Sequence, residues 1–344
     1  MPFGPDESVA AATARPTMND VAVAAGVALK TVSRVVNGED GVGEETAARV
    51  REAIDQLGYL RNDGARRLRQ GSRSSSIGLV LEDLADPFYS QLSRAVEEVA
   101  RTHGALLFAG SSAEDPVRER ELALDFCSRR VDGLIIVPTA ADHAYLAPEL
   151  AAGTKVVSVD RPVTGVDVDT VLVDNRAGIA AGVDHLTRRG HRRIGYLGDS
   201  LSIFTAAERC AGFRQAMARA GLAVDEACVA SGRPDTPTVG RALDRMLSGP
   251  EPITALLCGN NRSTVAVLRD LAARRSRLAL VGFDDFELAD LLPVPVTVIA
   301  QDPASMGRLA AELLFQRMNG GRAPSRRIEL PTRLIARGSG EIEL

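Results

Sequence analysis

The amino-acid sequence predicts a small all-helical domain followed by a larger part that is built from two α/β lobes. Three observations indicate this fold class. Residues 17–59 contain three short helical patterns, with a glycine-bearing turn between the first two. Residues 61–73 carry five arginines against a single acid. From residue 77 onward, short apolar runs alternate with helical stretches, a pattern typical of parallel sheets that are covered by helices on both faces.

The composition limits the function classes that need to be considered. A length of 344 residues suggests about two to three domains. The formal net charge is −4, so any binding to nucleic acid must come from a local basic patch. The four cysteines are far apart and form no C-x-x-C pair. We therefore expect neither disulfides nor a zinc site, and we expect the reducing environment of the cytoplasm.

The N-terminal residues carry no targeting signal. Residues 1–15 lack the apolar core of a secretory signal and are predicted to be a flexible tail. No stretch of the chain approaches the ~20 apolar residues that a membrane-spanning helix needs, so no membrane contact is expected.

Local signals predict where the first two helices begin and end. Thr17 can cap a helix with Asp20 three residues on, close to a capping box. Gly26 ends that helix, and a tight turn follows. A second helix is predicted over residues 29–37 and ends at Gly38, which suits the position after a helix. Its apolar face is formed by Val32, Val35 and Val36.

A third helix completes a recognisable unit. It is predicted to begin near Glu44 and Glu45, which suit the positive end of a helix dipole, and to end at Gly58. Three short helices with this turn form a helix-turn-helix unit, whose second helix lies in the major groove of DNA. The valines would then dock on the other helices while the polar face contacts DNA. The alternative is a small helical domain with a merely solvated polar face.

The motif D-V-A-x-x-A-G-V-x-x-x-T-V-S-R-V-x-N, which begins at Asp20, resembles the signature of the lactose-repressor family of bacterial transcription regulators. The resemblance extends more loosely over about 17–340. It implies a repressor that binds a near-palindromic operator as a homodimer. Ala28 departs from the family, which usually has a capping Ser there, and this loss would cost about 1 kcal/mol. The residues of this domain that we expect to contact DNA are Thr17, Leu29, Lys30, Thr31, Ser33, Arg34 and Asn37.

The basic segment after this domain is the predicted linker. Residues 65–69 could form one or two helical turns, which are too short to be stable alone and would order on DNA. The resemblance implies a hinge helix in which Leu68 wedges into the minor groove. From this segment we expect Asn62, Ala65 and Leu68 to contact DNA. The alternative is a solvated basic linker whose arginines touch phosphates only. The predicted parts are a flexible tail (1–15), a helix-turn-helix DNA-binding domain (16–60), a hinge helix or linker (61–74) and a two-lobe part (75–340) that binds the effector and forms the dimer.

The two-lobe part is predicted from alternating patterns. Runs that predict strands are 77–81, 105–109, 133–137, 155–159, 193–197, 255–258 and 278–283. Runs that predict helices are 88–103, 117–129, 145–152, 209–220 and 264–273. Two lobes of roughly 120–140 residues each would result. Ligands of such sheets bind outside the carboxyl ends of the strands, and a cleft between two lobes can close by hinge motion.

The sequence shows no catalytic constellation. It contains no G-x-G-x-x-G, no P-loop and no G-x-S-x-G. Asp167, Asp169 and Asp174 are interpreted as solvated acids of a turn and of strand ends. The four histidines, His103, His143, His185 and His191, have no ligand spacing. We therefore expect no catalytic residues, no metal and no cofactor.

The resemblance implies a small-molecule effector between the lobes. The residues at matching positions are Asp86, Phe88, Tyr89, Asp160, Arg209, Arg233, Asn260 and Asp284. A buried arginine with acids can bind polyol or amine groups by charge-assisted hydrogen bonds. A sugar is the commonest effector of the family, whereas Arg233 would suit an anionic ligand. Asn261 stands where the family often has Asp. Each residue could instead serve only as a cap or ion-pair partner.

Two other functions use a similar fold. A solute-uptake binding protein shares the two-lobe, periplasmic-binding-protein-like fold, but it would need a signal sequence and no helix-turn-helix. A cleft enzyme that hydrolyses sugars or nucleosides would need paired catalytic acids. The chain ends near Leu344 without a leucine heptad tail, which favours a dimer over a tetramer.

Overall fold

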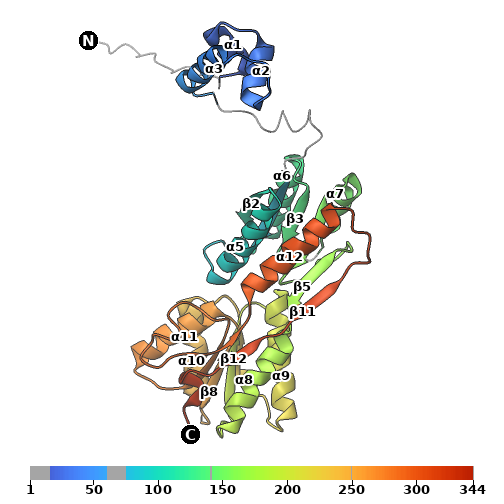
Figure 1. Ribbon diagram of the computed structural model, residues 1–344. Coiled ribbons are helices and arrows are strands. Elements are labelled where there is room, and N and C mark those ends of the chain that lie inside the picture. The colour runs from blue at the N-terminus through green and yellow to red at the C-terminus, as the bar shows by residue number, and fades with distance from the viewer. Residues whose placement is uncertain (1–15, 60–74, 140–141, 249, 344) are drawn as a thin grey trace, which may run out of the picture. The chain divides into compact units, whose positions relative to one another are not determined.

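The structure is a computed structural model that describes residues 16–59, 75–139, 142–248 and 250–343. The chain divides between Ser74 and Ser75 into two compact units, of which the first is helical and the second contains two sheets (Figure 1). The predictions for the tail (1–15) and for the linker residues Asn62, Ala65 and Leu68 lie outside the described residues. None of the described helices is long and apolar enough to cross a membrane.

The first unit consists of helices α1 (Met18–Ala25), α2 (Leu29–Asn37) and α3 (Glu44–Leu57). The predicted caps are confirmed. Thr17 and Asp20 form a capping box at α1, and Gly38 adopts the left-handed conformation that ends α2. Ala28 gives α2 no side-chain cap, as the sequence indicated. Val32 of α2 is completely buried in the core that the three helices share, which fixes the helix by its apolar face.

The first lobe of the second unit contains a six-stranded sheet in which all strand pairs are parallel. In spatial order its strands are β2 (Leu106–Ser111), β1 (Ser76–Leu81), β3 (Gly133–Ile136), β4 (Lys155–Val159), β5 (Asp169–Val173) and β11 (Arg327–Leu330). Its helices are α5 (Pro87–Thr102), α6 (Pro116–Ser128), α7 (Ala147–Ala152) and α12 (Pro303–Met318), with a 3₁₀ turn at Ala144–Leu146.

The second lobe repeats the strand order of the first. Its strands in space are β7 (Val229–Ser231), β6 (Ile194–Gly198), β8 (Ala255–Cys258), β9 (Ala279–Phe283), β10 (Thr297–Ala300) and β12 (Arg333–Ile335), of which only β12 is antiparallel to its neighbour. Its helices are α8 (Asn175–Arg188), α9 (Phe204–Arg219), α10 (Thr236–Leu247) and α11 (Asn261–Arg274), with 3₁₀ turns at Glu226–Cys228 and Ser339–Glu341. The predicted strands are therefore all confirmed, whereas α9 begins at Phe204 rather than at Arg209.

The two lobes are not formed by two consecutive segments of the sequence. The chain crosses from the first sheet to the second after β5, returns after β10 into α12, and crosses again between β11 and β12. Helix α12 and strand β11, which come late in the sequence, therefore complete the first lobe. Leu314 and Phe315 of α12 are buried in the same core as Ile77 of β1, and Figure 1 shows α12 in red beside the early helices of that lobe.

Asp169 corrects one sequence interpretation, because this acid is buried rather than solvated. Its carboxylate accepts hydrogen bonds from Arg317 Nε (2.7 Å) and Nη2 (2.9 Å) and from the backbone N–H of Arg326 (2.8 Å). Burial alone would raise its pKa, but these bonds outweigh burial and lower the pKa. Asp169 thus fastens α12 and the start of β11 to β5. Asp167 is exposed, as expected, and Asp174 caps α8.

Replacing this acid should destabilise the first lobe. Asp169→Asn loses charge-assisted hydrogen bonds and leaves Arg317 without its counter-charge, so we expect a loss of about 2–3 kcal/mol in unfolding free energy at pH 7. The folded-state pKa is lowered, so the carboxylate stabilises the fold above its unfolded pKa of about 4, and this advantage disappears as pH falls. Urea unfolding at pH 7 and at about pH 3 measures both effects, since the advantage is lost only below the unfolded pKa. Asp167→Asn is the matched control, and equal losses in the two variants would contradict the assignment.

Candidate functional site

The start of α2 is one of the exposed parts of the helix-turn-helix unit. Lys30 is exposed, and Leu29 is 46% exposed although it is large and apolar. Partly buried polar residues follow along the same helix: Thr31, Ser33, Arg34 and Asn37. Asn37 donates to Ser33 Oγ (3.3 Å), and Thr17 is engaged with Asp20. Among the predicted DNA-contact residues of α2, Leu29 and Lys30 are therefore the most exposed.

The turn between α1 and α2 is held by a residue that the sequence analysis did not predict. Arg49 of α3 donates from Nη2 to the backbone carbonyl oxygens of Ala25 and Gly26. These are the last residue of α1 and its left-handed cap. The guanidinium thereby fixes the α1–α2 turn against α3. Nothing in the linear motif marks this long-range contact.

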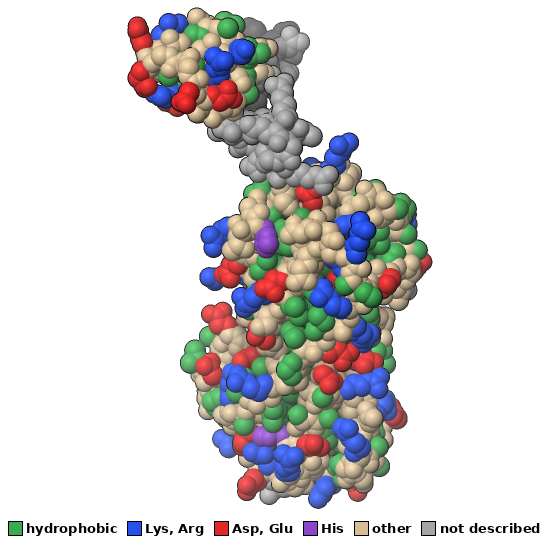
Figure 2. Space-filling view, turned by 45° about the vertical axis from the view of Figure 1, so that its right-hand side comes forward, with side chains coloured by type: hydrophobic (Ala, Val, Ile, Leu, Met, Phe, Trp, Pro, Cys, Tyr) green, Lys and Arg blue, Asp and Glu red, His purple; other side chains and the backbone are tan. Residues whose placement is uncertain are grey.

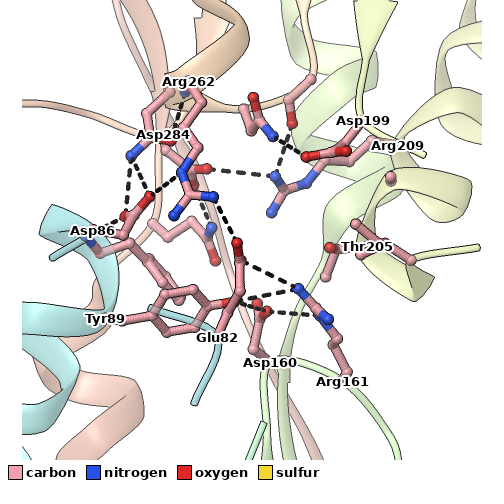
Figure 3. A pocket seen from close by; sticks show the side chains of 17 residues that line it. Glu82, Asp86, Tyr89, Asp160, Arg161, Asp199, Thr205, Arg209, Arg262 and Asp284 are labelled. Atoms are coloured by element: carbon pink, nitrogen blue, oxygen red, sulfur yellow. Dashed lines mark hydrogen bonds and ion pairs between the residues drawn. The ribbon is translucent and has the colours of Figure 1, made fainter. Parts of the chain in front are cut away.

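A polar cavity of about 50 Å³ lies between the two sheets of the second unit, at the carboxyl ends of their strands (Figure 3). Both lobes contribute to its walls. The predicted effector residues that line it are Asp86, Phe88, Tyr89, Asp160, Arg209, Asn260 and Asp284. This volume accommodates a few water molecules. A ligand as large as a sugar ring needs a rearrangement of the walls.

Arg233 is the one predicted effector residue that the structure does not bring to this cavity. It is exposed between β7 and α10, and it does not line the cavity. The reason is topological, because β7 is a three-residue strand at the edge of the sheet. The residues after β7 lead directly to Asp235, which caps α10. The loop therefore ends at the sheet edge, and Arg233 lies outside this cavity.

Two buried aspartates occupy equivalent positions in the two lobes. Asp160 follows β4 and Asp284 follows β9, and both have a left-handed backbone with φ of 69°. Each backbone N–H donates to the next strand, to Val171 at 2.8 Å and to Ile299 at 2.9 Å. Burial raises the pKa of both carboxyls. Left-handed conformations of residues other than glycine often mark functional sites, and Asp tolerates them better than most residues.

Arg209 is held rigidly in the wall of the second lobe. Its Nε donates to Asn175 Oδ1 (2.7 Å) and its Nη1 to the carbonyl oxygen of Gly259 (2.8 Å), with Asp284 Oδ2 at 3.4 Å. Its guanidinium carbon lies 3.8 Å from the ring centroid of Phe283, a cation–π contact. Sequence reasoning missed both Asn175 and Phe283. Arg209 is therefore oriented before any ligand arrives.

Two further arginines line the cavity and were not among the predicted effector residues. Arg161 is buried in the first lobe and pairs bidentately with Glu114 at 3.0 and 2.5 Å. Arg262 belongs to α11 of the second lobe, yet it reaches the first lobe. Its guanidinium contacts Glu82 (2.6 Å), Asp83 (3.0 Å) and Asp86 (3.1 Å), as Figure 3 shows for Glu82 and Asp86.

The interlobe contacts also explain one departure from the family pattern. Asn261 donates from Nδ2 to Asp86 Oδ1 (3.2 Å), where an aspartate at the same position would repel this carboxylate. Burial raises the pKa of Glu82 to about 7, although Arg262 works in the opposite direction. The ionised form of Glu82 therefore depends on its arginine partners.

The charges of the cavity favour some ligands over others. Five carboxylates, from Glu82, Asp86, Asp160, Asp199 and Asp284, stand against three guanidinium groups. Within the described ranges, no three or more His, Cys, Asp or Glu side chains gather in a way that could hold a metal ion. On the face of the molecule in Figure 2, acidic and basic side chains are interspersed over the larger unit. The arrangement can donate to and accept from a ligand that carries many hydroxyl groups.

Family models match both units. A model described as bacterial regulatory proteins, lacI family, matches residues 17–62, and a model of a periplasmic binding protein-like domain matches residues 183–340. The transcriptional regulator PtxS of Pseudomonas plecoglossicida is 33% identical over 344 residues, which cover 98% of this chain and 99% of PtxS.

Solved structures are similar over nearly the whole chain. The lac repressor dimer bound to operator and the anti-inducer ONPF has a TM-score of 0.78 at 26% identity, and the match covers 95% of this chain and 99% of that one. The complex of the transcriptional regulator CelR with cellobiose has a TM-score of 0.69 at 29% identity, with 95% and 100% covered. Identity of one third over almost the full length of PtxS, together with both domain matches, means that the chain belongs to the lacI family of bacterial regulatory proteins and is a DNA-binding transcriptional regulator.

Proposed function

We propose that this chain is a cytoplasmic repressor whose operator affinity is controlled by a small molecule bound in the interlobe cavity. The observation that carries the proposal is the convergence of Asp86, Asp160, Arg209 and Asp284 on one buried cavity at the strand ends. Residues 16–60 would read DNA, 61–74 would link the two units, and 75–340 would bind the effector and form the homodimer. We propose no catalytic activity.

The proposed effector is a neutral, hydroxyl-rich molecule such as a sugar. Carboxylates outnumber guanidinium groups in the cavity, and every arginine there already has an acidic partner. An anionic ligand would have to displace these acids. Arg233, which had favoured such a ligand, does not line the cavity. A sugar hydroxyl can both donate to a carboxylate and accept from a guanidinium. CelR, which is 29% identical, was solved with cellobiose.

A homodimer on a near-palindromic operator completes the proposal. A single helix-turn-helix head makes few contacts, and paired heads read half-sites related by two-fold symmetry. Edge strand β2 exposes Leu106 (64%) and Phe108 (42%), and Val117 at the start of α6 is 64% exposed. Unpaired edges with apolar side chains favour association with another chain. This edge of the first lobe is therefore a candidate for the dimer contact.

The DNA-reading role of α2 predicts a loss of specificity on mutation. Lys30→Ala and Arg34→Ala should each weaken binding to an operator selected from random DNA by about 1–3 kcal/mol, because Lys and Arg read guanine edges. Binding to unselected DNA at the same salt concentration should change little. Fluorescence anisotropy at one fixed salt concentration measures both affinities.

Arg51→Ala is the control for this experiment, since Arg51 is an exposed arginine on α3 that pairs with Glu44. It removes one positive charge from the same domain outside α2. If Lys30→Ala and Arg34→Ala weakened selected and random DNA equally, the two side chains would only contact the phosphate backbone.

The effector role of the cavity predicts different behaviour for two adjacent aspartates. A thermal-shift screen of sugars, sugar phosphates, nucleosides and organic acids identifies a ligand, because a molecule that binds only the folded state raises its stability. Asp284→Asn should then lower the affinity for that ligand about tenfold or more, since hydrogen bonds to a charged group contribute about 1.5–3 kcal/mol. Titration calorimetry measures this loss.

Asp285→Asn is the matched control. Asp285 pairs with Arg337 at 2.6 and 2.7 Å and does not line the cavity. Both variants should bind operator DNA without ligand, and only Asp285→Asn should keep the ligand response. Equal ligand affinity in the two variants would place the effector outside this cavity.

A further inference from the structure

Arg262 stands at a position that its own helix does not favour. It is the second residue of α11, whose first turn carries the positive end of the helix dipole. A cation there destabilises the helix, and the described first turn of α11 contains no acid that would offset it. Residues that break a local rule commonly have a role elsewhere in the fold. The compensation for Arg262 comes from the other lobe.

Three carboxylates of the first lobe surround the guanidinium. Glu82 accepts from Nη1, Asp83 from Nη2 and Asp86 from Nε, so each nitrogen has its own acid. All three acids lie in the short segment between β1 and α5. Asn261, the residue before Arg262, also donates to Asp86. The start of α11 is therefore joined to the first lobe across the cavity.

These contacts keep the cavity small. Arg262, Glu82 and Asp86 all line it, and a cavity volume of about 50 Å³ is smaller than a sugar ring needs. The side chains of Asn261 and Arg262 thus join the two lobes directly beside the cavity. If Arg262 withdrew, Asp83 and Asp86 would lose their cation, Glu82 would keep only Arg161 at 3.7 Å, and this contact between the lobes would be lost.

We propose that Arg262 is an interlobe latch, which closes the effector cavity by an internal ion cluster and must be released before an effector can enter. The proposal rests on the assignment of this cavity as the effector site. The latch makes Arg262 a determinant of effector choice, because an entering ligand has to replace its hydrogen bonds to Glu82, Asp83 and Asp86. Ligands with several hydroxyl or ammonium donors on one side satisfy this condition, and ligands that only accept do not.

The latch can be tested on the full chain without any effector. Hydrogen–deuterium exchange with mass spectrometry would compare wild type with Arg262→Gln in peptides 82–90 and 259–265. We expect exchange in both peptides to rise about tenfold or more, as the loss of a coupled contact allows the lobes to open. A role in α11 alone would give the reverse change in 259–265, since removing this cation favours the helix.

Arg274→Gln is the matched control. Arg274 lies on the same helix, is similarly exposed (31% against 36% for the side chain), and pairs only with Asp244 and Asp270 of the second lobe. This variant should leave peptide 82–90 unchanged. In 1 M NaCl exchange in peptide 82–90 of the wild type should rise only part of the way towards Arg262→Gln, because salt screens the partly exposed Arg262–Asp83 pair more than the less exposed Glu82 and Asp86.

Two outcomes would overturn the proposal. One is exchange in peptide 82–90 that rises no more in Arg262→Gln than in Arg274→Gln. The other is faster exchange throughout both lobes in Arg262→Gln and again in Arg262→Lys, which keeps the charge, because this result indicates general instability. The latch predicts that any rise in Arg262→Lys is confined to the two peptides. The exchange is measured without ligand, so failure of the latch is distinct from failure of the effector assignment.

Discussion

Glu82 lies between two arginines that come from opposite lobes, with Arg262 at 2.6 Å and Arg161 at 3.7 Å. Removing charged groups from water is costly, and the cost is offset only where partners of opposite charge lie close. Burial raises the pKa of Glu82 to about 7, so its charge is maintained by these arginines. The cavity as a whole follows the same rule. Burial raises the pKa of Asp160 and Asp284 as well, and the nearby arginines act in the opposite direction.

The topology places this charge pairing at the end of the strand that follows the linker in the sequence. Strand β1 begins immediately after the linker residues in the sequence, and its other end continues into Glu82 and Asp83. The lobes are joined by three crossings of the chain, which permit hinge motion while they keep both sheets intact. A ligand that separates Arg262 from these acids therefore acts on the strand that the linker precedes. The coupling is limited to the difference in ligand affinity between the open and closed states.

Local signals in the sequence predicted the local structure well. The capping pair Thr17 and Asp20 and the terminal glycine Gly38 depend on residues within one helical turn, and the helices begin and end where expected. Apolar runs predicted the strands because burial on both faces of a parallel sheet leaves no polar alternation. The acids after β4 and β9 were named from the family resemblance, and their role as effector ligands stays a prediction.

Contacts between distant residues were not predictable in this way. The sequence predicted that Asp169 is a solvated acid. In the structure Arg317, 148 positions later, pairs with it, because helix α12 returns to the first lobe. Nothing in the sequence distinguishes Arg262 from other charged residues on a helix. In the structure it lies beside Glu82, which is 180 positions earlier. Arg233 was assigned to the cavity from its place in the chain, and the short edge strand β7 leaves it outside. Each case depends on the pairing of elements, which hydrophobic periodicity does not encode.

The central claim is that Glu82 and Arg262 interact energetically across the cavity. A double-mutant cycle measures this directly, with Glu82→Gln, Arg262→Gln and the double variant compared by urea unfolding at low salt and pH 8, where Glu82 is ionised. The account predicts a coupling energy of about 1–3 kcal/mol that falls in 1 M salt. Additive effects, with a coupling energy near zero at low salt, would contradict it, because the two side chains would then contribute independently of each other.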